Sequence, residues 1–366
     1  MKRILLGQLG VYGDSLIATT IASQIKHDNP GCHLTWAIGT PYASILKNNP
    51  DVDAVWEYPI ASRWEVTSKW YQFAQEAQQM KLDGKFDEVY LTQVYPGFPE
   101  RFYDSLRESM FRGYGKITVP IETHILLSLE EVINVNDFVK LHSLEKKNTV
   151  ILFECSPESG QSWVTQDFAL KVAKMITDEI PDSAVILSGS SKIKTDNPNI
   201  IDGSVLTVRE MAELTEYCTL FIGTGSGLSQ VVQTTWAKKL PMIQLLKKGT
   251  VASVIWDRKR QNLPTRDIIE ISTCDEVKVY GCVTATTIGW DLARQIYCEE
   301  TTPDFTIIRF HMRFDKAKRE GNYLGILSAF AIALRDYGFS MELLRFFYTF
   351  PESIWKLITR KMRGIN

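Results

Sequence analysis

Three glycines and an acid near the start of the chain form the first pattern that could do chemistry. In the segment LLGQLGVYGDSL, Gly7, Gly10 and Gly13 recur at every third position, and Asp14 follows at once. An apolar run before the glycines predicts a buried strand, and helical spacing after them predicts a helix over residues 16–25. Such a turn lets the backbone approach a ligand closely, and free N–H groups at a helix start suit an anion. The alternative is a tight turn in which Asp14 only caps the helix.

A second glycine cluster, FIGTGSGLSQVV, follows another apolar strand. Gly223, Gly225 and Gly227 alternate with Thr224 and Ser226, so backbone N–H groups and two hydroxyls gather in one turn. These groups suit a phosphate, although the hydroxyls alone could simply cap the next helix. Ligands of parallel α/β sheets bind at the carboxyl ends of strands, so the two clusters together favour a diphosphate held between two domains. The first cluster lacks the G-x-G-x-x-G spacing that a nucleotide-dependent oxidoreductase would need.

The order of the predicted elements sets the fold class. Strand-like segments alternate with helical segments twice, and the charged segment SLEKKN separates the two runs. This alternation predicts parallel, doubly wound sheets. We therefore expect an α/β protein with two Rossmann-like domains whose sheets face a cleft, plus a helical C-terminal tail, with bounds 1–145, 146–300 and 301–366. The expected strands are 33–38, 52–58, 88–91, 149–154, 184–187, 200–202, 219–222 and 242–246. The expected helices are 16–25, 42–48, 64–80, 126–138, 168–179, 208–217 and 228–234.

The bulk composition excludes several classes of protein. The 366 residues are 45% hydrophobic and 23% charged, which is typical of globular proteins. A net charge of −2 and a pI near 6.3 argue against a nucleic-acid partner. The 6 cysteines and 5 histidines are scattered without metal-ligand spacing, so we expect no metal and no cofactor. There is no signal peptide and no run of about 18 apolar residues, so we expect a cytoplasmic protein.

Short motifs in both halves of the chain match one family pattern in order and spacing. In the first half these are Gly13-Asp14, Pro30, Asn49-Pro50 and the VDAV segment at residues 52–55. In the second half they are SGQSWVTQDFALKVAKMI and LTVREMAELTEYCTLFIGTGSGLSQVV. Together they resemble glycosyltransferase family 9, the ADP-heptose:lipopolysaccharide heptosyltransferases, over about residues 3–235. The resemblance implies a GT-B fold.

The resemblance also implies an activity. It is that of an inverting, metal-independent glycosyltransferase, which moves heptose or another sugar from a nucleotide diphosphate sugar to a lipopolysaccharide, other surface-glycan or lipid-linked acceptor. In the family the residue matching Asp14 is the base that takes the proton of the acceptor hydroxyl. Tyr95 and Phe98 in the YPGFP loop are candidates to stack on the acceptor sugar. The candidate donor-binding residues are Gly13, Gln161, Thr224, Gly225, Ser226, Gly227, Glu210 and Lys247. Glu154 and Glu158 flank the loop that holds Gln161 and are either sugar-hydroxyl ligands or solvated acids.

Four positions depart from the family pattern, all on the donor side. The family aspartate, histidine, phosphate-binding lysine and ribose-binding glutamate fall at Gly225, Gln230, Gln161 and Arg209. Lys247 and Lys248, after a predicted strand, are the candidates for the missing positive charge. Arg209 is expected either to pair with a phosphate or, as an early helix residue, to be exposed. These departures keep open a second function, a non-catalytic nucleotide-sugar or glycan-binding protein.

The C-terminal segment FSMELLRFFYTFPESIWKLITRKMRGIN combines aromatic and basic residues. Such an amphipathic end suits an anionic membrane surface, and a lipid-linked acceptor would explain it. The alternative is a closing helix that packs on the first domain.

Overall fold

The chain forms two compact units. The computed structural model describes residues 1–98, 101, 104–303, 305–319 and 321–337. The first unit comprises Met1–Gln93 and Ser105–Pro303 and holds both parallel sheets. The second comprises Val94–Asp104 and Asp304–Asn366. Both glycine clusters therefore belong to the first unit.

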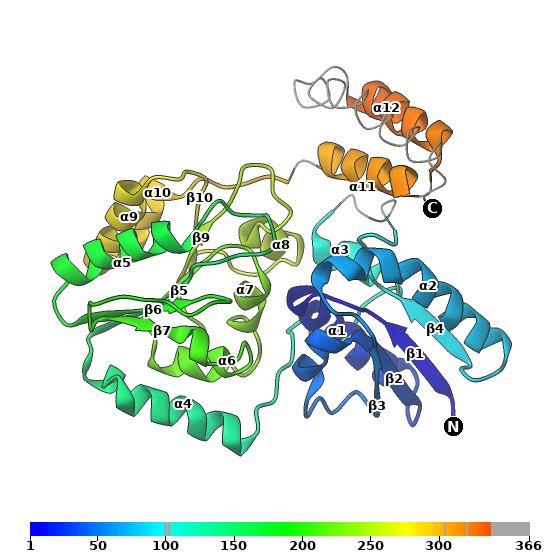
Figure 1. Cartoon of the computed structure of the whole chain (residues 1–366), viewed down its shortest axis with the longest axis horizontal. Helices are drawn as coiled ribbons and strands as arrows, with labels where there is room; N and C mark the ends of the chain where they lie inside the picture. Colours follow the sequence, from blue (N-terminus) through cyan, green and yellow to red (C-terminus); the bar gives the residue numbers. More distant parts are fainter. Residues whose placement is uncertain (99–100, 102–103, 304, 320, 338–366) are drawn as a thin grey trace, which may run out of the picture. The chain divides into compact units, whose positions relative to one another are not determined.

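The first sheet carries four parallel strands in the order β3-β2-β1-β4. Right-handed crossovers place α1 and α2 on opposite faces of this sheet (Figure 1). Because both faces are covered, the central strand β1 is a continuous apolar run, in which Ile4, Leu5 and Leu6 are fully buried. The elements are β1 (Arg3–Gly7), α1 (Tyr12–Asp28), β2 (His33–Gly39), the 3-10 helix η1 (Thr40–Leu46), β3 (Ala54–Tyr58), α2 (Arg63–Leu82), β4 (Glu88–Leu91) and α3 (Leu106–Phe111).

The second sheet carries six parallel strands in the order β10-β9-β8-β5-β6-β7. Figure 1 shows α5, α9 and α10 on one face and α4 and α6 on the other. Its core packs Ile151 and Phe153 of β5 against Val172 and Ile176 of α5. The strands are β5 (Thr149–Glu154), β6 (Ser183–Ser188), β7 (Ile200–Asp202), β8 (Leu220–Gly223), β9 (Met242–Leu245) and β10 (Ile268–Ile271). The helices are α4 (Leu129–Leu141), α5 (Gln166–Glu179), α6 (Glu210–Leu214), α7 (Gly227–Val231), α8 (Val254–Arg260), α9 (Glu276–Ile288) and α10 (Trp290–Tyr297).

The described part of the second unit is a helix pair, α11 (Phe305–Arg319) and α12 (Tyr323–Tyr337). Phe310 and Phe314 of α11 pack against Phe330 of α12, and the Phe310 and Phe330 ring centroids lie 4.9 Å apart. The predicted helical C-terminal region is confirmed by this pair. The aromatic and basic end, residues 339–366, lies outside the described residues. Within the described residues, no helix has the length and apolar character needed to cross a membrane.

The predicted fold class is confirmed, but the predicted start of the first helix is wrong. The helix α1 begins at Tyr12 with Val11 as its N-cap residue, and no side chain caps it. Asp14 is therefore the third residue of the helix, and the alternative that it serves as the N-cap is wrong. Gly13 does not adopt a left-handed backbone and lies within the first helical turn, where the sequence pattern indicated a loop.

Other boundaries move by a few residues. The helix expected at 42–48 is the 3-10 helix η1, which begins with Pro41 in its first turn. The helix expected at 208–217 divides into α6 and the 3-10 helix Thr215–Tyr217. The predicted edge strand at 200–202 is confirmed as β7, while β10 was not predicted.

Candidate functional site

Buried amides hold the first glycine turn in place. The Gln8 side chain donates from Nε2 to the Gly10 carbonyl at 2.7 Å and to Gln93 Oε1 at 3.0 Å. The Gly10 N–H donates to the same Gln93 oxygen at 3.1 Å. A Cβ at Gly10 would lie 2.7 Å from the ring of Tyr42, so the turn has no room for a side chain there. Packing around Gly10 and the amide network together fix the path of the backbone into α1.

Asp14 projects from the first turn of α1 and is half-buried. Burial raises the pKa of its carboxyl to about 7, and the positive charge of Arg63 acts in the opposite direction. A carboxyl with this pKa is partly ionised at neutral pH and can both take up and release a proton. This is the property that a general base requires.

The second glycine turn is shaped by Gly225. Its backbone φ is +67°, in the left-handed region that residues with a side chain rarely adopt. A Cβ there would lie 2.7 Å from Ala252 Cβ and 2.7 Å from Leu246 Cδ2. The aspartate of the resembling family therefore does not fit this backbone. Ser226 next to it is the N-cap of α7 and accepts a hydrogen bond from the Leu228 N–H at 3.3 Å.

The two glycine turns touch each other. A Cβ on Gly13 would lie 3.4 Å from Gly227 Cα and 3.4 Å from Gln230 Cγ. A Cβ on Gly227 would lie 3.0 Å from Tyr12 Cβ. The first turn of α1 thus packs directly on the first turn of α7. The structure thereby brings together the predicted catalytic Asp14 and the predicted donor turn at 224–227.

Glu154 contacts the second turn from the end of β5. It is buried and accepts hydrogen bonds from the Thr224 N–H at 2.9 Å and from the Ser226 hydroxyl. Burial raises the pKa of this carboxyl to about 7, although hydrogen bonds from Thr224 lower it. The alternative of a solvated acid is wrong for Glu154. The signal in the sequence was a charged residue directly at the end of an apolar strand.

Gln161 and Lys247 lie together where the loops after β5 and β9 meet. The Lys247 N–H donates to the Gln161 carbonyl at 2.9 Å, and its ammonium donates to the Gly160 carbonyl at 2.9 Å. The Gln161 side chain accepts a hydrogen bond from the Thr250 hydroxyl. Because β5 and β9 both flank β8, these loops lie at the same sheet edge as the 224–227 turn.

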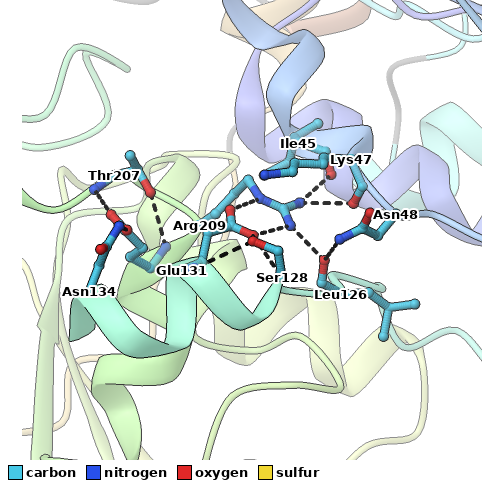
Figure 2. Close-up of polar contacts among 10 residues, drawn as sticks. Ile45, Lys47, Asn48, Leu126, Ser128, Glu131, Asn134, Thr207 and Arg209 are labelled. Carbon is cyan, nitrogen blue, oxygen red and sulfur yellow. Dashed lines mark hydrogen bonds and ion pairs between the residues drawn. The ribbon is translucent and has the colours of Figure 1, made fainter. Parts of the chain in front are cut away.

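Arg209 is buried and joins parts of the chain that are far apart in sequence (Figure 2). Its Nε donates to Glu131 Oε1 at 2.6 Å, and one terminal nitrogen donates to Glu131 Oε2 at 3.1 Å. Its other bonds go to the carbonyls of Leu126 at 2.6 Å, Lys47 at 3.2 Å and Ile45 at 3.3 Å. The expectation of an exposed arginine is wrong, because five acceptor atoms satisfy the guanidinium inside the protein.

The acids near Arg209 serve local structure. Burial alone would raise the pKa of Glu131, but Arg209 and the Ser128 N–H lower it to about 2. Glu210 accepts from the Thr207 N–H at 2.7 Å and from the Asn134 amide at 3.0 Å. Both carboxyl oxygens of Glu210 therefore have partners within the protein. Donor contact by Glu210 stays a prediction.

The two acceptor candidates belong to the second unit. The guanidinium carbon of Arg101 lies 3.6 Å from the centroid of the Phe98 ring, and Tyr95 is exposed. Acceptor binding at Tyr95 and Phe98 therefore stays a prediction. No cluster of His, Cys, Asp and Glu side chains that could hold a metal ion occurs among the described residues.

Comparison with known proteins confirms the predicted resemblance at the level of the fold. No protein-family model and no curated protein matches the chain. Among solved structures, the chain shares the two-domain GT-B fold of glycosyltransferases. One match is a glycosyl transferase family 9 structure from Veillonella parvula DSM 2008, with a TM-score of 0.54 and 15% identity over 77% of this chain and 89% of that chain. Another is the ADP-heptose lipopolysaccharide heptosyltransferase II of E. coli, with a TM-score of 0.53 and 14% identity over 79% of this chain and 99% of that chain.

Arg209→Met should destabilise the chain strongly. Removing one partner of a buried ion pair costs about 3–5 kcal/mol, because the other charge is left buried without compensation. The loss should appear in the free energy of unfolding from urea titrations at pH 7. It should shrink as the pH falls from 4.5 toward 2, because the folded pKa of Glu131 lies below its ordinary value and protonation ends its contribution there.

The exposed pair Lys174–Asp178, at 2.8 Å, supplies the matched control. Lys174→Met should cost less than about 1 kcal/mol, as exposed helix pairs do. Equal effects of the two substitutions would contradict the assigned role of Arg209.

Gly225→Ala should lower the free energy of unfolding by about 2 kcal/mol or more, from the left-handed backbone and the two short contacts combined. Gly31→Ala is the matched control, because Gly31 has a φ of +75° with nothing within 4 Å. It should cost only about 1 kcal/mol. Equal losses in the two variants would show that Ala252 and Leu246 do not restrict the turn.

Proposed function

We propose that the protein is an inverting, metal-independent glycosyltransferase. It would move heptose or another sugar from a nucleotide diphosphate sugar to a lipopolysaccharide, other surface-glycan or lipid-linked acceptor. The observation that carries this proposal is the direct contact of the two glycine turns, with Asp14 beside it, in a fold shared with solved glycosyltransferases. The E. coli structure is of an enzyme named for ADP-heptose, which supports a nucleotide diphosphate sugar as the donor class.

The donor is assigned to the second sheet, within residues 146–300. The 224–227 turn gathers backbone N–H groups and the hydroxyls of Thr224 and Ser226, which suit phosphate oxygens. The Gly225 N–H donates to Ser229 Oγ at 3.2 Å, so a phosphate oxygen there would replace that hydroxyl as its acceptor. Lys247 is exposed at the same sheet edge and is a candidate cation for the diphosphate. The acceptor is then assigned to residues 1–145. Tyr95 and Phe98 stay the candidates to stack on its sugar, although the structure groups them with the second unit.

The chemistry needs one base and a departing diphosphate. Asp14 takes the proton of the acceptor hydroxyl while that oxygen forms a bond to the sugar carbon, and the bond from this carbon to the diphosphate breaks. Attack from the face opposite the diphosphate inverts the sugar carbon. The Arg63 charge favours the ionised Asp14 carboxyl, which is the form that accepts the proton.

A non-catalytic nucleotide-sugar or glycan-binding protein of the same fold is the second candidate. The departures from the family pattern at Gly225, Gln230 and Gln161 favour it, because they replace residues on the donor side. Turnover separates the two functions, since a binding protein would hold the donor without consuming it.

Asp14→Asn should abolish most turnover and leave donor binding intact. The donor is first found by thermal-shift screening of nucleotide sugars, because a bound ligand raises the melting temperature by mass action. Transfer or donor hydrolysis should then fall by roughly 10²–10⁴-fold, the usual contribution of a general base.

The stability of the same variant is the control. The folded pKa of Asp14 lies above its ordinary value, so the ionised carboxyl opposes folding above about pH 4. Asp14→Asn should therefore melt at the same or a higher temperature than the parent at pH 8. Near-full turnover in this variant would rule out Asp14 as the base.

We also propose that the protein is cytoplasmic and binds the anionic inner face of the cell membrane through residues 354–366. The sequence of this segment combines Ile354 and Trp355 with Lys356, Arg360 and Lys361, a composition that suits an anionic lipid surface. Removing residues 354–366 should abolish co-sedimentation with phosphatidylglycerol vesicles and leave hydrolysis of soluble donor unchanged. A full-length protein that stays in the supernatant would contradict this proposal.

A further inference from the structure

The turn assigned to the donor diphosphate already holds an acid. Glu154, the last residue of β5, is only 5% exposed. It accepts hydrogen bonds from the Thr224 N–H and from the Ser226 hydroxyl. Two donors that a diphosphate would use at this turn are therefore engaged by one carboxyl group.

An ionised Glu154 would oppose a bound diphosphate for two reasons. The carboxylate competes for the same N–H and hydroxyl donors, and its charge repels the phosphates where little water screens it. A protonated carboxyl has neither effect, because it is uncharged and its O–H can donate to a phosphate oxygen.

We propose that Glu154 is a donor-binding residue that acts in its protonated form, so that each diphosphate bound at the 224–227 turn is accompanied by one proton taken up from solvent. This inference rests on the proposed function and deepens it, because it names a group that selects the donor. The Glu154 O–H would supply a hydrogen bond at a site where Gln161 brings no positive charge.

The surroundings of Glu154 favour such proton uptake near neutral pH. Burial raises the pKa of Glu154 to about 7 in the free protein. Protonation of this carboxyl on diphosphate binding therefore costs little free energy near neutral pH. The thiol of Cys155 stays neutral, because burial and then the charge of Glu154 raise its pKa to about 12. Other titratable groups on the adjoining elements are Asp14, Glu158, Asp202 and Lys247.

The experiment uses the full-length Asp14→Asn chain, because Asp14 also titrates near pH 7 and would add its own pH dependence. The probes are ADP-glucose, UDP-glucose and GDP-mannose, whose diphosphate diesters keep a constant charge between pH 6 and 8.5. Calorimetry at pH 8 in two buffers of different ionisation enthalpy should report uptake of about one proton per ligand. The Kd should rise by up to about tenfold per pH unit above pH 7 and change less below it.

The double variant Asp14→Asn, Glu154→Gln is the matched control. The glutamine keeps the length of the side chain and an oxygen that accepts from the Thr224 N–H. This chain should bind the probe with a Kd that does not depend on pH and without proton uptake. Should it fail to fold, the proton count on Asp14→Asn still decides the question.

The possible failures are distinguishable. Binding to Asp14→Asn without proton uptake, with a pH-independent Kd, overturns the role of Glu154 and leaves the proposed function standing. An unchanged pH dependence in the double variant does the same. Absence of binding by all three probes at every pH contradicts both the inference and the proposed function.

Discussion

The contact between the first turns of α1 and α7 is the constraint on which the site depends. Gly13 and Gly227 approach so closely that a Cβ on Gly227 would lie 3.0 Å from Tyr12 Cβ. Side chains at these positions would separate the turns and move Asp14 away from the 224–227 turn. The glycines therefore allow elements of the two sheets to meet.

Buried charged side chains form further contacts between elements of the first sheet and elements of the second. Arg209 follows β7 of the second sheet and binds carbonyls of Ile45 and Lys47, which follow β2 of the first. Arg107 on α3 pairs with Asp257 on α8 at 3.1 Å. The position that matches a ribose-binding glutamate in the resembling family is thus occupied by a residue that stabilises the first unit. At this position the chain differs from the family pattern both in the type of residue and in its role, because Arg209 binds other parts of the protein.

Sequence patterns predicted the elements well where burial is local and continuous. The apolar runs of β4, β5 and β7 gave the observed bounds, and the alternation of strands and helices gave the fold class. Charged residues were harder to place. The burial of Arg209 depends on Glu131, 78 positions away, and that of Glu154 depends on Thr224, 70 positions away, so no local pattern could reveal either. The start of α1 was missed because a glycine in a first helical turn has the same sequence signal as a glycine in a loop.

A crystal structure with a bound, non-transferable nucleotide diphosphate sugar tests the account most directly. The account predicts diphosphate oxygens within hydrogen-bond distance of backbone N–H groups and hydroxyls of the 224–227 turn. It also predicts that the sugar carbon bonded to the diphosphate faces the Asp14 carboxyl, with room for an acceptor hydroxyl between them. A diphosphate bound away from both glycine turns would contradict the account.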